Sequence, residues 1–147
     1  MEMIVLCGIQ ASGKSSFARE RWYESHVRIN LDMLRTRKRE DIVLYACLAA
    51  KAPIVVDNTN PTRGQRLRYL SLARAAGYES VALYYFQSTV DDAVARNASR
   101  AEHTRVPEIA IRGTSGKLEI PSLGEGWDRL VTVSIAAIGG FETKEEP

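Results

Sequence analysis

The sequence predicts an α/β domain in which helices cover a parallel sheet of five strands. Short apolar runs of strand length alternate with longer segments whose apolar residues have helical spacing. With 45% hydrophobic and 26% charged residues, the composition is that of an ordinary globular chain. The 147 residues give room for one compact domain, which we expect to span residues 1–147.

The first predicted elements are a buried strand, a helix and a second, shorter strand. Residues 3–7 form a continuous apolar run that ends at Gly8, which is typical of a central strand buried on both faces. Residues 14–24 follow as a helix with aromatic residues near helical spacing. Residues 26–29 are expected to form a second short strand, which ends in the polar stretch from Asn30 to Asp32.

The middle of the chain adds two helices around a third strand. Residues 40–52 have apolar side chains at helical spacing, and Pro53 ends this helix. Residues 54–56 are three β-branched residues and form the third strand. The next helix is predicted over residues 62–76, and Gly77 suits its C-terminal cap.

The fourth strand and the next helix are defined by an apolar run followed by capping residues. Residues 81–86 form the strand, and the helix after it extends to about residue 100. Ser88 or Thr89 can cap this helix, because a hydroxyl group there accepts the free backbone N–H of the first turn.

The last third of the chain gives weaker signals. A helix from about Pro107 is expected, although Gly113 and Gly116 weaken it. Residues 130–135 form the fifth strand, and residues 143–147 read as a frayed acidic tail.

Three features of the sequence restrict the class of protein: its net charge, its two cysteines and its N-terminal segment. The net charge of +2 does not by itself indicate a nucleic-acid-binding protein, so local clusters of arginine matter more. Cys7 and Cys47 lie in apolar stretches and are expected to be buried thiols in a reducing compartment. The opening apolar run is too short for a signal peptide or a membrane span, so we expect a cytoplasmic protein without a membrane partner.

A phosphate-binding loop follows the first strand. Residues 8–15 match G-x-x-x-x-G-K-[ST] between a predicted strand and a predicted helix, which is the context that this motif requires. Its backbone N–H groups would surround phosphate oxygens at a helix N-terminus, Lys14 would bind the β- and γ-phosphates, and Ser15 would bind Mg²⁺. ATP and Mg²⁺ are therefore the expected cofactors. The predicted nucleotide contacts are Gly8, Gln10, Ala11, Ser12, Gly13, Lys14, Ser15 and Ser16.

A kinase also needs a group that orients and deprotonates the acceptor hydroxyl. Asp32 follows the second strand, at the sheet edge where ligands of open α/β sheets bind. Arg35 would share a helix face with Asp32 and could hold a phosphate of the acceptor. From the residues alone, Asp32 fits a catalytic base and a helix N-cap equally well.

Three short patterns behind the phosphate loop resemble polynucleotide 5′-hydroxyl kinases, in particular the kinase domain of polynucleotide kinase-phosphatases. They are Asn30-x-Asp32-x-x-Arg35, Asp57-Asn58-Thr59-Asn60-Pro61 and Arg96-Asn97-x-x-Arg100. The similarity covers about residues 3–135. It implies an adenylate-kinase-like P-loop kinase fold with a short helical lid. It also implies ATP-dependent phosphorylation of a 5′-hydroxyl group on RNA or DNA.

The resemblance also implies roles for individual residues. Asp32 would be the general base, and Arg35 would contact the acceptor's phosphate. Asp57 would support the Mg²⁺ and phosphate site through water. On the lid helix, Arg96 would lie near the adenine and Arg100 at the transferred phosphoryl group, so the expected catalytic set is Lys14, Asp32 and Arg100.

Other residues in these patterns leave more than one interpretation open. Asn58, Thr59 and Asn60 are candidate substrate contacts with Arg35 and Asp57, although Thr59 and Asn60 could instead form the turn before Pro61. The sequence also departs from the family, because Leu31 replaces a frequent basic residue and residues 111–117 lack an aromatic-rich lid helix. No D-x-D-x-T phosphatase motif occurs in the sequence.

Two basic runs flank the expected acceptor side. One contains Arg35 and residues 37–39, and the other contains Arg63, Arg66 and Arg68. They could line a channel for a nucleic-acid backbone or could be solvated helix faces.

The sequence therefore favours a kinase that acts on 5′-hydroxyl ends of RNA or DNA. A kinase for a nucleoside, sugar or other metabolite is the alternative. A nucleotide-binding module without catalysis is a third interpretation, which the presence of Asp32, Arg96 and Arg100 disfavours.

Overall fold

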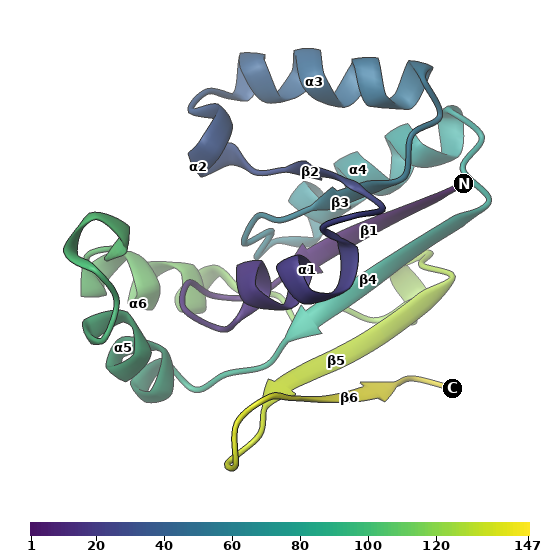
Figure 1. Cartoon of the computed structure of the whole chain (residues 1–147). Coiled ribbons are helices and arrows are strands. Elements are labelled where there is room, and N and C mark those ends of the chain that lie inside the picture. Colours follow the sequence, from purple (N-terminus) through teal and green to yellow (C-terminus); the bar gives the residue numbers. More distant parts are fainter.

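A single mixed sheet with helices on both faces organises the chain. The structure is a computed structural model that describes residues 1–147. The sheet has six strands in the order β2-β3-β1-β4-β5-β6 (Figure 1). The strands are β1 (Glu2–Cys7), β2 (Val27–Ile29), β3 (Ile54–Val56), β4 (Ser80–Phe86), β5 (Arg129–Ile135) and β6 (Phe141–Glu145).

Helices connect the parallel strands and cover the sheet. They are α1 (Lys14–Trp22), α2 (Leu31–Leu34), α3 (Arg37–Ala49), α4 (Arg63–Ala75), α5 (Val90–Ala98) and α6 (Glu108–Lys117), with short 3₁₀ turns at Glu102–Thr104 and Leu123–Glu125. In Figure 1, α3 and α4 lie on one face of the sheet and α1 on the other. None of these helices combines the length and the apolar composition that crossing a membrane requires.

Strand β1 is buried on both faces, as the apolar run predicts. Met3 and Val5 pack into the core under α3 and α4, whereas Ile4 and Leu6 pack against α1. Because successive side chains of a strand point to opposite faces, only a fully apolar run can fill both cores. Burial of β1 thereby fixes the position of the loop that leaves its carboxyl end.

The sheet differs from the prediction of five parallel strands. The first five strands are parallel, but β6 pairs with β5 antiparallel, so the expectation of a frayed tail over residues 143–147 is wrong. Gly139 and Gly140 both have positive φ and form the tight reversal before β6. Phe141 then packs edge-to-face on Phe17, with 5.1 Å between the ring centroids.

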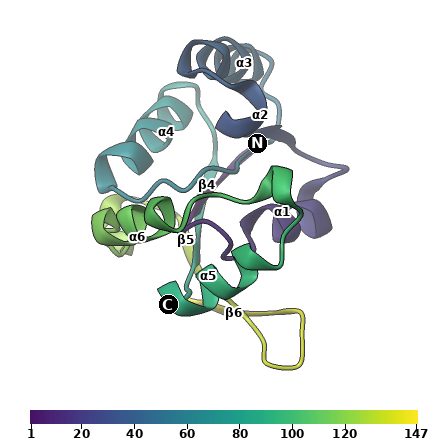
Figure 2. The same ribbon diagram turned by 90° about the vertical axis from the view of Figure 1, so that its left-hand side faces the viewer.

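Helix α6 confirms the helix predicted from about Pro107, although it contains Gly113 and Gly116, which weaken that prediction. Ile111 of α6 is completely buried and packs with Ile9 and Ala11 of the phosphate loop and Ala93 of α5. This apolar contact outweighs the low helix propensity of glycine. Helices α5 and α6 therefore form the predicted helical lid beside the phosphate loop. Figure 2 shows them at the carboxyl edge of the sheet, with α2.

The predicted caps of the other helices agree with the structure. Thr89 caps α5 through a bond from the backbone N–H of Asp92 to its hydroxyl oxygen. Thr62 and Gln65 form a capping box at the start of α4, and Gly77 follows its end with φ of +81°. These caps set the lengths of the helices that support the carboxyl edge of the sheet.

Candidate active site

The phosphate loop turns sharply between β1 and α1, and two of its glycines are required sterically. A Cβ atom at Gly8 would lie 2.8 Å from the carbonyl oxygen of Phe86. One at Gly13, which has φ of +97°, would lie 2.8 Å from the ring of Phe141. The same turn points the backbone N–H groups at the start of α1 into a concave anion-binding site.

Lys14 is buried under this loop, and the loop's own carbonyl groups hold it. Its Nζ atom donates to the carbonyl oxygens of Gly8 at 2.9 Å and Ile9 at 2.7 Å. Burial lowers the pKa of Lys14 to about 8, and the nearby Asp57 carboxylate partly opposes this shift. An anion bound in the loop would stabilise the ammonium group and raise its pKa again.

Ser15 and Asp57 supply an oxygen pair beside the loop. The Ser15 hydroxyl donates to Oδ2 of Asp57 at 2.8 Å, and the Asp57 side chain is only 1% exposed. The guanidinium of Arg28 contacts both residues and balances the carboxylate charge. A hydroxyl and a carboxylate beside the phosphate loop fit Mg²⁺, which prefers oxygen ligands.

Asp32 lies opposite the phosphate loop. It belongs to the short helix α2, whose N-cap is Asn30, because the Asn30 side chain accepts the backbone N–H of Met33 at 2.9 Å. The N-cap interpretation of Asp32 is therefore wrong. Asp32 instead lines a cavity of ≈ 270 Å³, called here the loop cavity, together with Lys14, Ser15 and Arg100.

A second cavity of ≈ 790 Å³, called here the basic cavity, adjoins the first. Both cavities are lined by Ser15, Asp32 and Arg100. The other charged or ionisable side chains of the basic cavity are Arg28, Arg35, His103 and Arg105. Asp32 is the one carboxylate in its lining, so the cavity is strongly positive.

The backbone at Arg35 is strained where it enters the basic cavity. Arg35 follows α2 with φ of +77° and ψ of −41°, a conformation that non-glycine residues rarely adopt. Its backbone N–H donates to the carbonyl oxygen of Leu31 at 2.7 Å. The expectation that Arg35 shares a helix face with Asp32 is wrong, because α2 ends at Leu34, but both residues line the basic cavity.

The predicted substrate contacts at 58–60 have structural partners. Asn58 lines the loop cavity, but its Oδ1 atom accepts the backbone N–H of Leu31 at 2.8 Å. Asn60 lines neither cavity, and its side chain donates to the carbonyl oxygen of Leu6 at 2.8 Å. Thr59 lines the loop cavity, and its carbonyl oxygen accepts the backbone N–H of Gly8 at 2.9 Å.

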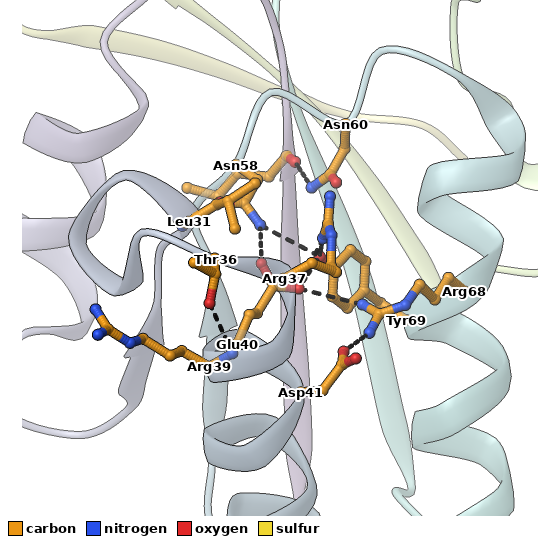
Figure 3. A network of polar contacts seen from close by, with 11 residues as sticks. Leu31, Thr36, Arg37, Arg39, Glu40, Asp41, Asn58, Asn60, Arg68 and Tyr69 are labelled. Carbon is orange, nitrogen blue, oxygen red and sulfur yellow. Dashed lines mark hydrogen bonds and ion pairs between the residues drawn. The ribbon is translucent and has the colours of Figure 1, made fainter.

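A buried carboxylate that the sequence does not indicate holds Asn58 in place. Glu40 of α3 is completely buried and accepts from the hydroxyl of Tyr69 at 2.6 Å and from Arg37 at 2.8 Å (Figure 3). It also accepts from Arg68 at 3.1 Å and from Asn58 at 3.2 Å. This Glu40 network joins α3 and α4 to the loop that fixes the start of α2.

The lid residues divide into one that faces the cavities and one that anchors the lid. Arg100 lies just beyond the end of α5, not on the helix as expected, and lines both cavities. Arg96 lines neither, because its Nε atom donates to the carbonyl oxygen of Ala11 at 2.6 Å and its Nη2 atom to Ser88 at 2.5 Å. Arg96 therefore ties α5 to the phosphate loop.

The second basic run does not form the predicted channel. Arg66 is completely buried and pairs with Glu125 at 2.5 Å, and Arg68 pairs with Glu40 and Asp41. Both interpretations of this run, as channel and as solvated face, are wrong for Arg66. The sequence does not indicate that Arg66 is buried, because its partner Glu125 is distant along the chain.

Two residues of the site were missed by the sequence patterns. Arg28 lies within a predicted strand, where an arginine is easily taken for an exposed edge residue. Glu40 directly follows a basic run and is easily taken for an exposed residue at the start of a helix. Only their three-dimensional contacts identify them.

Comparison with known proteins gives one family match and several partial similarities. The family model described as AAA domain matches residues 3–121. The bifunctional polynucleotide phosphatase/kinase of Schizosaccharomyces pombe is 27% identical over 145 residues, which is 96% of this chain and 35% of that protein. The chain spans about a third of the length of the curated relatives it matches.

Solved structures share the fold at lower identity. A gluconokinase from Sinorhizobium meliloti 1021 is 21% identical with a TM-score of 0.60, covering 90% of this chain and 81% of that one. Kti12 of Chaetomium thermophilum, in complex with ADP-AlF3, is 18% identical with a TM-score of 0.67, covering 90% of this chain and 88% of that one. At these identities the likeness establishes the P-loop kinase fold and not the acceptor.

Proposed function

The chain belongs to the AAA domain family, and from this premise we propose that it transfers the γ-phosphate of ATP to the 5′-hydroxyl of an RNA or DNA end. One observation carries the proposal: Asp32, Lys14 and Arg100 line a single cavity at the phosphate loop. A nucleotide-binding module without catalysis would need the loop but not a carboxylate and a lid arginine facing it. The S. pombe relative, named as a polynucleotide phosphatase/kinase, supports the choice of acceptor.

In this mechanism the chain's residues act on the proton and on the phosphoryl charge. Asp32 accepts the proton of the acceptor hydroxyl as its oxygen bonds to the γ-phosphorus and the bond to ADP breaks. Lys14 and Arg100 stabilise the negative charge on the transferred group. Ser15 and Asp57 would hold Mg²⁺, which neutralises and orients the phosphate oxygens when bound.

The basic cavity supports an anionic acceptor. Four arginines and His103 surround one carboxylate, Asp32, so the cavity attracts a group that carries phosphates. The nucleotide that bears a 5′-hydroxyl also carries a phosphate on its 3′ side, and Arg35 stands beside Asp32 to bind it. A neutral acceptor would leave Arg35 and Arg100 without an anionic partner, whereas Arg28 already pairs with Asp57.

The direct test is phosphate transfer from radiolabelled ATP to a defined set of acceptors. We expect label on RNA or DNA oligonucleotides with a 5′-hydroxyl and none on the same oligonucleotides with a 5′-phosphate. Gluconate serves as a small anionic competitor. Label on gluconate in preference to either nucleic acid would contradict the proposal and favour a small-molecule kinase.

Salt dependence separates the two acceptor classes independently. For an oligonucleotide, counterion release should raise KM by about 20-fold between about 50 and 200 mM salt, if three phosphates of a single strand are contacted. A small acceptor should respond far less over the same range. A KM for the oligonucleotide that does not change with salt would count against binding through the basic cavity.

A further inference from the structure

Arg28 occupies the position assigned to the metal ion. It lies on the edge strand β2, paired in register with Val55, and extends over the start of α1. Its Nε and Nη2 atoms lie 2.9 and 2.7 Å from Oδ2 of Asp57. Nη2 also donates to the hydroxyl oxygen of Ser15 at 3.3 Å. The guanidinium therefore contacts both oxygen ligands of the candidate Mg²⁺ site.

These contacts use the oxygens that a metal ion would need. Oδ2 of Asp57 already accepts the Ser15 hydroxyl and the Nε–H group of Arg28, which uses both lone pairs of that oxygen, and Nη2 of Arg28 lies 2.7 Å from it. Positive charge is already concentrated here, because Lys14 and Arg100 line the same cavity. A divalent cation next to the guanidinium would add repulsion around one buried carboxylate.

We propose that Arg28 is an exchangeable cation of this site and sets its Mg²⁺ requirement. Arg28 neutralises Asp57 while Mg²⁺ is absent, and it withdraws from Ser15 and Asp57 when Mg²⁺ and nucleotide bind. Its side chain is 39% exposed, so the guanidinium can return to water without a change in the fold. The inference rests on the proposed function only for the use of Mg²⁺ and a nucleotide.

Exchange between the Arg28 guanidinium and Mg²⁺ predicts a change in Mg²⁺ affinity, because the two binding equilibria are linked. If the Arg28 contact and Mg²⁺ exclude each other, each weakens the other by the same factor. Loss of the guanidinium must then lower the Mg²⁺ concentration that is needed for nucleotide binding. If Arg28 only held Asp57 in place, its loss would instead raise the Mg²⁺ concentration needed, because a metal ligand would become disordered.

The test measures ADP affinity by calorimetry across a Mg²⁺ titration, with no acceptor present. Arg28→Gln should lower the half-saturating Mg²⁺ concentration by about fivefold, the effect of one competing charge-assisted contact at a partly exposed site. Arg19→Gln is the matched control. It removes a positive charge one turn from Ser15, from an exposed residue without an ion pair, and so reports the general electrostatic effect alone.

The outcomes separate exchange from other roles. An unchanged or raised Mg²⁺ requirement in Arg28→Gln, relative to Arg19→Gln, would overturn the proposal. Arg28→Lys, which keeps the charge but cannot form the forked contact, should fall between Arg28→Gln and the unmodified chain. This variant decides the question if Arg28→Gln does not fold.

A melting experiment gives a second readout. Arg28→Gln should lose thermal stability in EDTA and regain most of it with Mg²⁺ and ADP, since the metal then compensates Asp57. A purely structural role of Arg28 predicts the same loss in both conditions. Because neither experiment contains an acceptor, their results stand even if the chain phosphorylates something other than a 5′-hydroxyl end.

Discussion

Lys14 places a buried positive charge in the phosphate loop, where a bound phosphate would be its partner. Without a ligand, its ammonium group donates mainly to the carbonyl oxygens of Gly8 and Ile9, and no anion contacts it directly. This arrangement satisfies the donors but leaves the charge poorly solvated, and burial lowers the pKa of Lys14 to about 8. A bound phosphate is a better partner for the ammonium than carbonyl groups are.

The lowered pKa of Lys14 predicts how ADP affinity depends on pH. Below pH 8 the residue is already charged in the free chain, so affinity should be flat. Above it, binding must take up a proton, and affinity should fall by up to about tenfold per pH unit. Calorimetry from about pH 7 to about pH 9, in buffers of different ionisation enthalpy, measures both the affinity and the proton uptake. Equal affinity at both ends of this range would refute the shift.

The strained backbone at Arg35 predicts that glycine and alanine variants differ in stability but not in acceptor binding. Arg35→Gly should remove the strain of a positive φ, whereas Arg35→Ala should keep it. The glycine variant should therefore be more stable than the alanine variant by about 1 kcal/mol in urea denaturation. Both should raise the acceptor KM equally, because both lack the guanidinium. Equal stability of the two variants would show that the backbone is relaxed there.

At the scale of elements, the short helix α2 depends on its neighbours. Four residues are too few for a stable helix, and its position is set by the Asn30 cap and by Asn58, which accepts the N–H of Leu31. Asn58 in turn is held by Glu40 and by the hydroxyl of Tyr69 (Figure 3). The Glu40 network therefore supports the element that carries Asp32.

Removal of the charge at the centre of the Glu40 network should destabilise the chain. Glu40→Gln leaves the guanidinium groups of Arg37 and Arg68 without their buried counter-charge, and should lower the free energy of unfolding by about 2 kcal/mol. Asp41→Asn is the control, since Asp41 is 39% exposed and pairs with Arg68 alone, so the loss should stay below about 1 kcal/mol. Urea denaturation of both variants checks the difference, and equal losses would contradict a special role for Glu40.

The helices and strands also show which elements could be predicted from sequence patterns and which could not. Strand β1 and the helix after the phosphate loop could be predicted, because an apolar run and a glycine motif are local signals. Strand β6 could not, because its stability depends on pairing with β5 and on Phe141 packing against Phe17. Contacts between distant segments leave no pattern in the segment itself.

At the scale of the molecule, the parallel sheet brings three separate segments to one edge. The phosphate loop follows β1, Asp32 follows β2 and Asp57 follows β3, so parallel strands place them together. The lid supplies Arg100 from outside the sheet, and Arg96 and Ile111 anchor the lid to the loop. The position of Asp32 at this edge was predictable from the strand order, whereas that of Arg100 was expected only from the family resemblance, and the catalytic roles of both residues stay predictions.

The motif order could not predict which residues face the cavity and which only hold the surrounding structure in place. Asn58 and Asn60 stand in a pattern next to Asp57, but their amide groups bind other groups of the protein, in Asn58 the backbone of Leu31 and the side chain of Glu40 and in Asn60 the backbone of Leu6. Arg28 and Arg66 both look like surface charges, yet one contacts the metal position and the other is completely buried. Spacing identifies which residues reach an edge of the sheet, and only packing decides which of them face the cavity.

The central claim is that Asp32 acts as the base across from the phosphate loop, and Asp32→Asn tests it most directly. Asparagine keeps the shape of the side chain but cannot take up the proton. With a 5′-hydroxyl oligonucleotide, we expect transfer to fall by at least about 10²-fold, while calorimetry finds ADP affinity within about twofold of the unmodified chain. Transfer by Asp32→Asn within a few-fold of the unmodified rate would contradict the account.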